Sequence, residues 1–170
     1  VKAGDRRFLP SLVAVGAGAG WVATGRGAVA RIDLASNRVV AVIKLLPGSP
    51  AGLAVAGGSV WVAAGGDGVA RIDAATNRLL GTIRLDLYAE RVAVGGGALW
   101  VGGPTTDPIV EIAGGVARID AATGRVREIV PTGLPIGLAA AAGAVLITEP
   151  DSVGGALECI HPGETPAGMG

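Results

Sequence analysis

The sequence predicts an all-β fold built from repeated four-stranded units, on three observations. Similar segments recur along the 170-residue chain: AVARIDLASNRVVAVIKL (28–45), GVARIDAATNRLLGTIRL (68–85) and GVARIDAATGRVREIV (115–130). A glycine-rich segment with a tryptophan precedes each copy, so that Trp21, Trp61 and Trp100 are 40 and 39 residues apart. Thirty glycines and ten prolines separate short runs rich in Val and Ile, which is typical of strands joined by tight turns. A repeat of about 40 residues indicates the blades of a β-propeller.

We expect one domain, residues 1–170, with about four four-stranded blades. The units span about residues 12–45, 52–85, 91–130 and 137–162. In the second unit the expected strands are 52–55, 59–64, 68–73 and 78–85. The fourth unit is less complete, with three expected strands and Leu146 at the tryptophan position. No run has the length and 3.6-residue period that a helix needs.

The number of blades leaves two alternatives for the ring, since propellers usually have four to eight. In the first, residues 1–5 supply the missing outer strand of the fourth unit and close a four-bladed ring. In the second, the chain is part of a six- to eight-bladed propeller, and its first and last blades have unpaired edges.

The turn between the third and fourth strands reads DLASNR, DAATNR and DAATGR in successive units. Asn37, Asn77 and Gly124 share one position of this turn, which predicts a positive φ there. An aspartate begins each turn, where its carboxylate can accept hydrogen bonds from amides two residues on. The repeated arginines are expected to pair with these aspartates, Asp33, Asp73 and Asp120. These arginines are Arg31, Arg71 and Arg118 on the third strands and Arg38, Arg78 and Arg125 after the turns.

Two segments imitate other classes of protein. LVAVGAGAGWVATGRG (12–27) fits a loose dinucleotide-binding fingerprint, but its glycine-rich turn recurs in every unit, which predicts a hairpin. The segment 129–148 carries no charge over a length that could span a bilayer. It contains two prolines and three glycines, which disfavour a continuous helix, so we expect strands there and no membrane insertion.

Composition and charge exclude several functions. The 14 basic and 14 acidic residues balance and are dispersed, so we expect no nucleic-acid-binding face. Cys159 and His161 are the only residues of their kinds, which excludes an internal disulfide and a Cys/His zinc set. We expect Cys159 to pack as a small apolar residue of a third strand and His161 to replace the turn aspartate. No cofactor is expected.

Over residues 12–148 the repeated pattern of V-W-V-A, G-x-x-V-A-R-I-D and T-N-R resembles the YVTN-type β-propeller repeat. This repeat is itself similar to those of virginiamycin B lyase-like propellers. The resemblance implies a propeller fold and favours an extracytoplasmic location. Resemblance to the lyase-like proteins implies an active site in which histidine and acidic residues act with a metal. Here the single histidine is expected on the opposite face from the variable loops, which departs from that pattern.

Candidate site residues are those that differ between repeats on the loops joining strands two and three and joining successive units, because scaffold residues recur. They are Arg26, Asp67, Tyr88, Glu90, Asp107, Glu111, Glu149 and Asp151. We expect a non-catalytic module that binds a protein partner or a small ligand through this loop face. The alternatives are a metal-dependent lyase and a sensor domain of a larger membrane-attached protein.

Overall fold

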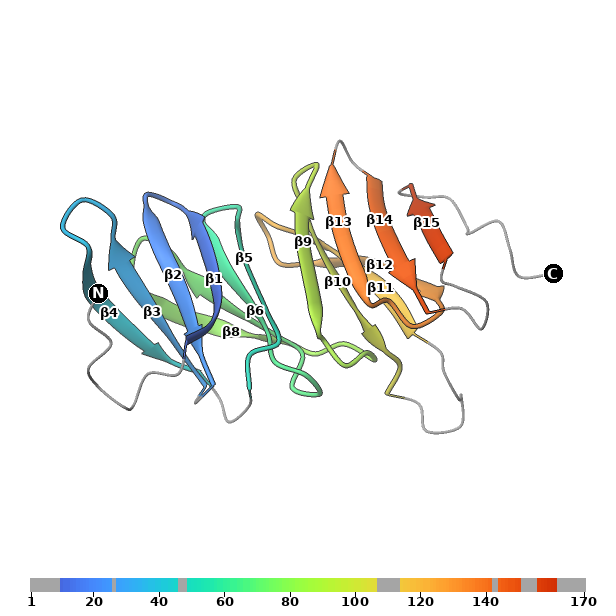
Figure 1. Ribbon diagram of the computed structural model, residues 1–170, viewed down its shortest axis with the longest axis horizontal. Helices are drawn as coiled ribbons and strands as arrows, with labels where there is room; N and C mark the ends of the chain where they lie inside the picture. The colour runs from blue at the N-terminus through green and yellow to red at the C-terminus, as the bar shows by residue number, and fades with distance from the viewer. Residues whose placement is uncertain are drawn as a thin grey trace.

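The computed structural model describes residues 10–25, 27–45, 49–106, 114–141, 144–150 and 156–161 (Figure 1). In this part of the chain every regular element is a β-strand, and the strands form three four-stranded sheets and one three-stranded sheet. All sheets are antiparallel, and in each the strands follow in sequence order. The molecule is therefore all-β, with four propeller blades, as the repeats predict.

Blade 1 contains β1 (Pro10–Gly16), β2 (Ala19–Thr24), β3 (Ala28–Asp33) and β4 (Arg38–Lys44). Blade 2 contains β5 (Gly52–Ala56), β6 (Ser59–Ala63), β7 (Val69–Asp73) and β8 (Arg78–Ile83). Blade 3 contains β9 (Arg91–Gly95), β10 (Ala98–Pro104), β11 (Gly114–Asp120) and β12 (Val126–Thr132). Blade 4 contains β13 (Gly137–Ala141), β14 (Ala144–Glu149) and β15 (Ala156–Ile160). The uncharged segment 129–148 thus belongs to three strands, and the described residues contain no helix long and apolar enough to cross a membrane.

The first two strands of each of blades 1–3 are joined by a tight hairpin. In blade 1 the two turn residues, Ala17 and Gly18, have φ of 50° and 71°. The glycine pairs of the next two hairpins, at 57–58 and 96–97, also have positive φ at both positions. Two positive φ values at the central residues are typical of the type I′ turn, whose twist matches that of the strands. The supposed nucleotide fingerprint is therefore a hairpin, as predicted.

The turn between the third and fourth strands also has the predicted conformation. Asn37, Asn77 and Gly124 have φ of 53°, 60° and 78°. In blade 2 the Oδ1 atom of Asp73 accepts hydrogen bonds from the amides of Ala75 and Thr76, at 3.0 and 2.7 Å, and from the Thr76 hydroxyl at 2.8 Å. The equivalent aspartates of blades 1 and 3 hold their turns in the same way.

These turns predict a loss of stability in acid. Hydrogen bonds lower the pKa of each aspartate below its ordinary value of 3.8. The largest effect comes from the hydrogen bond of the Ser36 hydroxyl to Asp33, of the Thr76 amide to Asp73, and of the Arg127 guanidinium to Asp120. A carboxylate with a lowered folded-state pKa stabilises the fold above its unfolded-state pKa, and this contribution is lost as the pH falls through the folded-state value. We therefore expect Tm to fall progressively below about pH 4.

Thermal melts between pH 7 and pH 2 at constant ionic strength measure this effect. The variant Asp120→Asn removes one titrating carboxylate, so its Tm should be lower at pH 7 and should fall less steeply below about pH 4. Parallel profiles for Asp120→Asn and the wild type would contradict the assignment of acid sensitivity to these turns.

The hydrophobic core lies between neighbouring blades. Trp61 is fully buried and packs in one cluster with Leu99 and Val101, which belong to the second strand of blade 3. Trp21 packs in the same way against blade 2, and Trp100 against blade 4. The tryptophans are therefore inter-blade packing residues, as their recurrence predicts.

The repeated arginines of the third strands lie on these tryptophans instead of pairing with the turn aspartates, so the pairing prediction is wrong for them. The Arg71 guanidinium lies 5.0 Å from the centre of the Trp61 ring, and its Nη2 atom donates to the carbonyl oxygen of Ala122 at 2.5 Å. Arg31 stacks on its tryptophan at 5.4 Å, and its Nη1 atom donates to the Asn77 side chain at 3.1 Å. Arg31 and Arg71 thus bond the turn of the following blade.

We call the pairs Trp21–Arg31 and Trp61–Arg71 the Trp–Arg clamps. They join blade 1 to blade 2 and blade 2 to blade 3. In blade 3, Arg118 lies 5.7 Å from the ring centre of its tryptophan and 3.4 Å from the Glu128 carboxylate of its own blade. Among the described residues, Asp120 pairs with Arg127, at 2.6 Å.

The four blades form an open arc in the described residues. The inner strands contact one another in series, β1 with β5, β5 with β9 and β9 with β13. Figure 1 shows blade 1 and blade 4 at opposite ends of the long axis, extending in opposite directions. Residues 1–5, the expected closing strand, lie outside the described residues.

Candidate binding face

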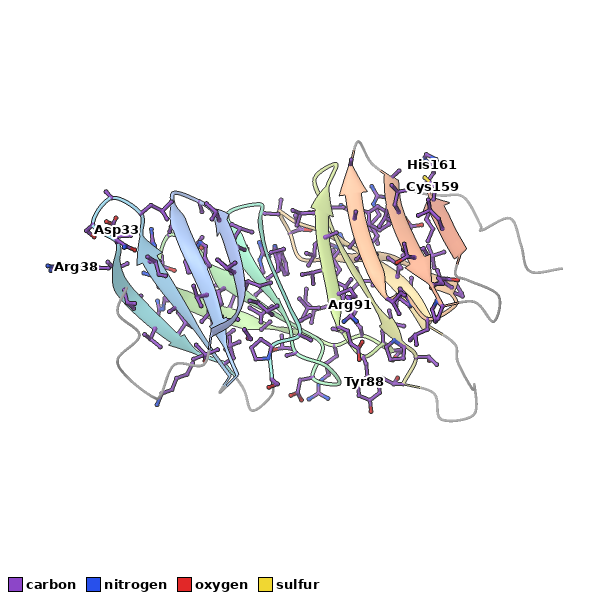
Figure 2. The ribbon with its side chains drawn as sticks, in the orientation of Figure 1. Asp33, Arg38, Tyr88, Arg91, Cys159 and His161 are labelled. Carbon is purple, nitrogen blue, oxygen red and sulfur yellow. The ribbon has the colours of Figure 1, made fainter. Side chains whose placement is uncertain are left out.

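The structure describes four of the eight predicted site residues: Asp67, Tyr88, Glu90 and Glu149. The other four, Arg26, Asp107, Glu111 and Asp151, lie outside the described residues. Figure 2 shows Tyr88 and Arg91 on one face of the molecule, whereas Asp33 and His161 lie on the opposite face. We call the face of Tyr88 the loop face.

The connection between β8 and β9, residues 84–90, positions Tyr88 and Glu90. Ala89 pairs with Gly65 through two backbone hydrogen bonds of 3.0 Å. On its other side the Tyr88 amide donates to the Pro104 carbonyl at 2.8 Å, and the Glu90 amide donates to Gly102 at 3.1 Å. The connection is therefore held between the β6–β7 turn of blade 2 and the extended end of β10 in blade 3.

Tyr88 is the most prominent side chain of this connection. Its ring packs over Gly66, where an added Cβ would lie 3.0 Å from the ring atom Cε1. The side chain is nevertheless 48% exposed. Asp67 is exposed in the same β6–β7 turn as Gly66. The structure therefore brings Tyr88 to the turn that carries Asp67.

Glu90 belongs to a polar group at the boundary of blades 3 and 4. Its carboxylate lies 3.5 Å from the Nη1 atom of Arg91. The Arg91 Nε atom donates to the carbonyl oxygen of Ile136 at 2.9 Å, and the Ile136 side chain is exposed. Sequence reasoning missed Arg91 and Ile136. The signal for Arg91 is its difference from Leu12, Gly52 and Gly137 at the aligned strand positions.

Glu149 ends β14 in blade 4 and faces Gly133, where an added Cβ would lie 2.6 Å from the carboxylate. Its Oε1 atom is buried and has no hydrogen-bond partner among the described residues. The four described candidates are thus divided between two places: three lie on or beside the β8–β9 connection, and Glu149 lies on blade 4.

The described residues offer no metal site. No group of three or more His, Cys, Asp or Glu side chains is placed to hold an ion within them. His161 is exposed and lies 3.5 Å from the Cys159 thiol, on the opposite face from Tyr88 (Figure 2). The prediction of a turn position for His161 agrees with the register, because Ile160 pairs with Val145 as Ile119 pairs with Leu99. Cys159, predicted to be packed, is exposed instead.

Two open surface pockets, of about 290 and 250 Å³, are formed by residues outside the β8–β9 connection. The first is lined by Arg118, Asp120 and Arg127, and the second by Thr123 and Gly124 among others. Both therefore adjoin the turn between the third and fourth strands of blade 3. The charged side chains of the first pocket are engaged with one another or with Glu128.

Comparison with known proteins supports the fold. No protein-family model matches the chain, and no curated protein matches it. Among solved structures, Kuenenia stuttgartiensis hydrazine synthase is similar with a TM-score of 0.67 and 22% identity, over 85% of this chain and 45% of that chain. BamB from Moraxella catarrhalis has a TM-score of 0.62 and 14% identity, over 92% of this chain and 48% of that chain. The computationally designed Ika4 protein has a TM-score of 0.75 and 13% identity, over 94% and 95%.

Hydrazine synthase and BamB are β-propeller proteins. At identities of 22% and less these similarities show the fold alone. The chain spans about half the length of the hydrazine synthase and BamB chains and nearly the whole of the Ika4 chain.

Proposed function

We propose that the chain is a non-catalytic β-propeller module of the YVTN type that binds a protein partner through the loop face. The fold is consistent with an interaction scaffold. The repeated V-A-R-I-D and T-N-R segments support the YVTN assignment. The observation that carries the proposed function is the position of Tyr88, the single tyrosine of the chain, half exposed on a backbone held from both sides.

Tyr88 has the properties of an interface anchor. Tyrosine is enriched at the centre of protein interfaces, because a large ring loses little conformational entropy on binding. The backbone hydrogen bonds of Tyr88, Ala89 and Glu90 fix the connection before any partner arrives, and such preorganisation lowers the entropic cost of association. Scaffold residues recur in every unit, whereas this tyrosine occurs in one connection only.

The surroundings of Tyr88 indicate the character of the partner. The exposed Asp67 lies in the adjacent turn, and Asp86 is exposed two residues before the tyrosine. The half-exposed Glu90 follows it. We therefore infer a partner segment that places an apolar group on the tyrosine ring and basic side chains beside these carboxylates. Such charges mainly increase the association rate and select the partner.

Selection from a displayed library of random peptides tests this proposal. Peptides selected on the wild-type chain should be enriched in basic residues, and the Tyr88→Ala variant should bind them about 30-fold more weakly, as expected for an anchor worth about 2 kcal/mol. Leu34→Ala, an exposed position on the turn side of blade 1, should leave the affinity unchanged. Equal affinity for Tyr88→Ala and the wild type, or a loss with Leu34→Ala, would contradict a Tyr88-centred binding face.

A further inference from the structure

The junctions between blades repeat one packing scheme. Apolar side chains on the inner strand of each later blade face the blade before it. Leu53 and Val55 of blade 2 pack on the cluster that contains Trp21, and Val92 of blade 3 packs on the cluster that contains Trp61. An added Cβ at Gly16 of blade 1 would lie 2.7 Å from Val55. In blade 4, Leu138 and Ala140 occupy the equivalent positions and pack on the cluster that contains Trp100.

The same positions of blade 1 are uncovered. They are occupied by Val13 and Val15, as the pairing of Ala14 with Trp21 and of Ala54 with Trp61 shows. Val13 is 73% exposed and Val15 is 70% exposed. Blade 1 therefore presents the apolar face with which each of the other blades contacts its predecessor.

The opposite face of blade 4 is uncovered as well. Leu146 pairs with Cys159 in the register in which Trp100 pairs with Arg118, and Leu157 corresponds to Val116. Trp100 and Val116 are fully buried against the next blade, whereas Leu146 is 45% exposed and Leu157 is 71% exposed. Blade 4 therefore presents the apolar face with which blades 1–3 contact their successors.

We propose that two copies of the chain associate head to tail, with the Val13–Val15 face of each against the Leu146–Leu157 face of the other. The two faces are the two halves of the junction that the chain forms internally three times. Figure 1 shows blade 1 and blade 4 at the two ends of the long axis, so that a partner arc of the same length can contact both. The assembly is a ring of eight blades, at the upper end of the usual range.

The chain lengths of two similar structures agree with this assembly, because hydrazine synthase and BamB contain about twice the matched length in a single chain. The junction between copies differs from the internal ones in one respect. Leu146 and Cys159 occupy the strand positions that hold the tryptophan and arginine of the Trp–Arg clamps in blades 1 and 2. The junction between copies therefore lacks the ring stacking and the arginine hydrogen bond. We therefore expect it to be weaker than the internal junctions and to dissociate on dilution.

Sedimentation velocity and light scattering over a range of concentrations test the proposal. The wild-type chain should change from 16.6 kDa to twice that mass as its concentration rises, and no larger species should form, because a ring of two leaves no free face. A monomer at every concentration would overturn the proposal. A ladder of increasing masses would also overturn it, since it would indicate a contact that does not close.

Two charged variants identify the faces. Val15→Glu and Leu157→Lys each place a charge in one half of the junction, and each alone should raise the dissociation constant of the dimer at least about tenfold. Mixing the two should restore a dimer, because the mixture can form one unmodified junction and one junction with a Glu–Lys pair. If the dimer formed instead through two identical faces, the variant with the substitution outside that face would still dimerise alone. Mixing would then not restore the dimer of the other variant.

Leu80→Glu is the matched control, because Leu80 is also exposed, at 56%, but lies on the outermost strand of blade 2. It should dimerise like the wild type. The fluorescence emission of the three buried tryptophans should be unchanged in all variants, which shows that the monomer fold is intact. If Leu80→Glu abolishes the dimer, or if both face variants dimerise like the wild type, the proposed faces are wrong.

Discussion

Replacement of Trp61 by alanine is expected to lower the free energy of unfolding by about 3–5 kcal/mol, the range for truncation of a buried tryptophan. The indole is fully buried between blades 2 and 3, and its Nε1 atom donates to the Ala56 carbonyl at 3.2 Å. Truncation leaves a cavity at the junction and removes the ring on which Arg71 stacks. The loss therefore affects two blades at once.

Urea unfolding followed by circular dichroism measures this change, with the m-value as a check on two-state behaviour. Leu80→Ala, at an exposed position of the same blade, should change stability by less than about 0.5 kcal/mol. A Trp61→Ala variant as stable as Leu80→Ala would show that the blades do not depend on this junction.

The second large effect is expected for Gly103→Ala. Gly103 is buried near the end of β10, and an added Cβ would overlap the carbonyl oxygen of Tyr88. Overpacking of this kind costs about 1–3 kcal/mol. Displacement of the β8–β9 connection would also weaken the backbone bonds of Tyr88 and Glu90 to β10, each worth about 1 kcal/mol. Peptide binding should fall together with stability, because the same shift moves the tyrosine.

Gly25→Ala is the control for this substitution. Gly25 follows the second strand of blade 1, as Gly103 lies at the end of the second strand of blade 3, but nothing lies within 4 Å of the Cβ that would be added there. Thermal melts should place Gly25→Ala near the wild type and Gly103→Ala several degrees lower. Equal melting temperatures would contradict the close approach of the β8–β9 connection to β10.

The features that depend on local spacing were predictable from the sequence. The expected strands of the second unit differ from β5–β8 by at most two residues at any end. The hairpins and the left-handed positions of Asn37, Asn77 and Gly124 were predicted because recurrence identifies a backbone requirement. The inter-blade role of the tryptophans followed from the same recurrence.

The polar contacts between blades were not predictable, since they depend on how one sheet is rotated against the next. Arg71 is two residues from Asp73, and pairing of these opposite charges is the simplest expectation from the sequence. In the structure the arginine lies on Trp61 and bonds Ala122, 51 residues further along the chain. The setting of Tyr88 likewise requires three separate segments, which are the β8–β9 connection, the β6–β7 turn and the end of β10. Variation between repeats identified the tyrosine but not the backbone that holds it.

The absence of a Trp–Arg clamp between blades 3 and 4 has a consequence for local unfolding. In repeat proteins each unit contacts only its neighbours, so stability is approximately a sum of terms along the chain. The junctions between blades 1 and 2 and between blades 2 and 3 have clamps. At the junction between blades 3 and 4, Arg118 pairs with Glu128 of its own blade instead of bonding blade 4, and blade 4 has three described strands. Amide protons of β13–β15 should therefore exchange with solvent earlier than those of β5–β7, because blade 4 opens without disrupting the rest. The chain would then lose structure from one end, one blade at a time.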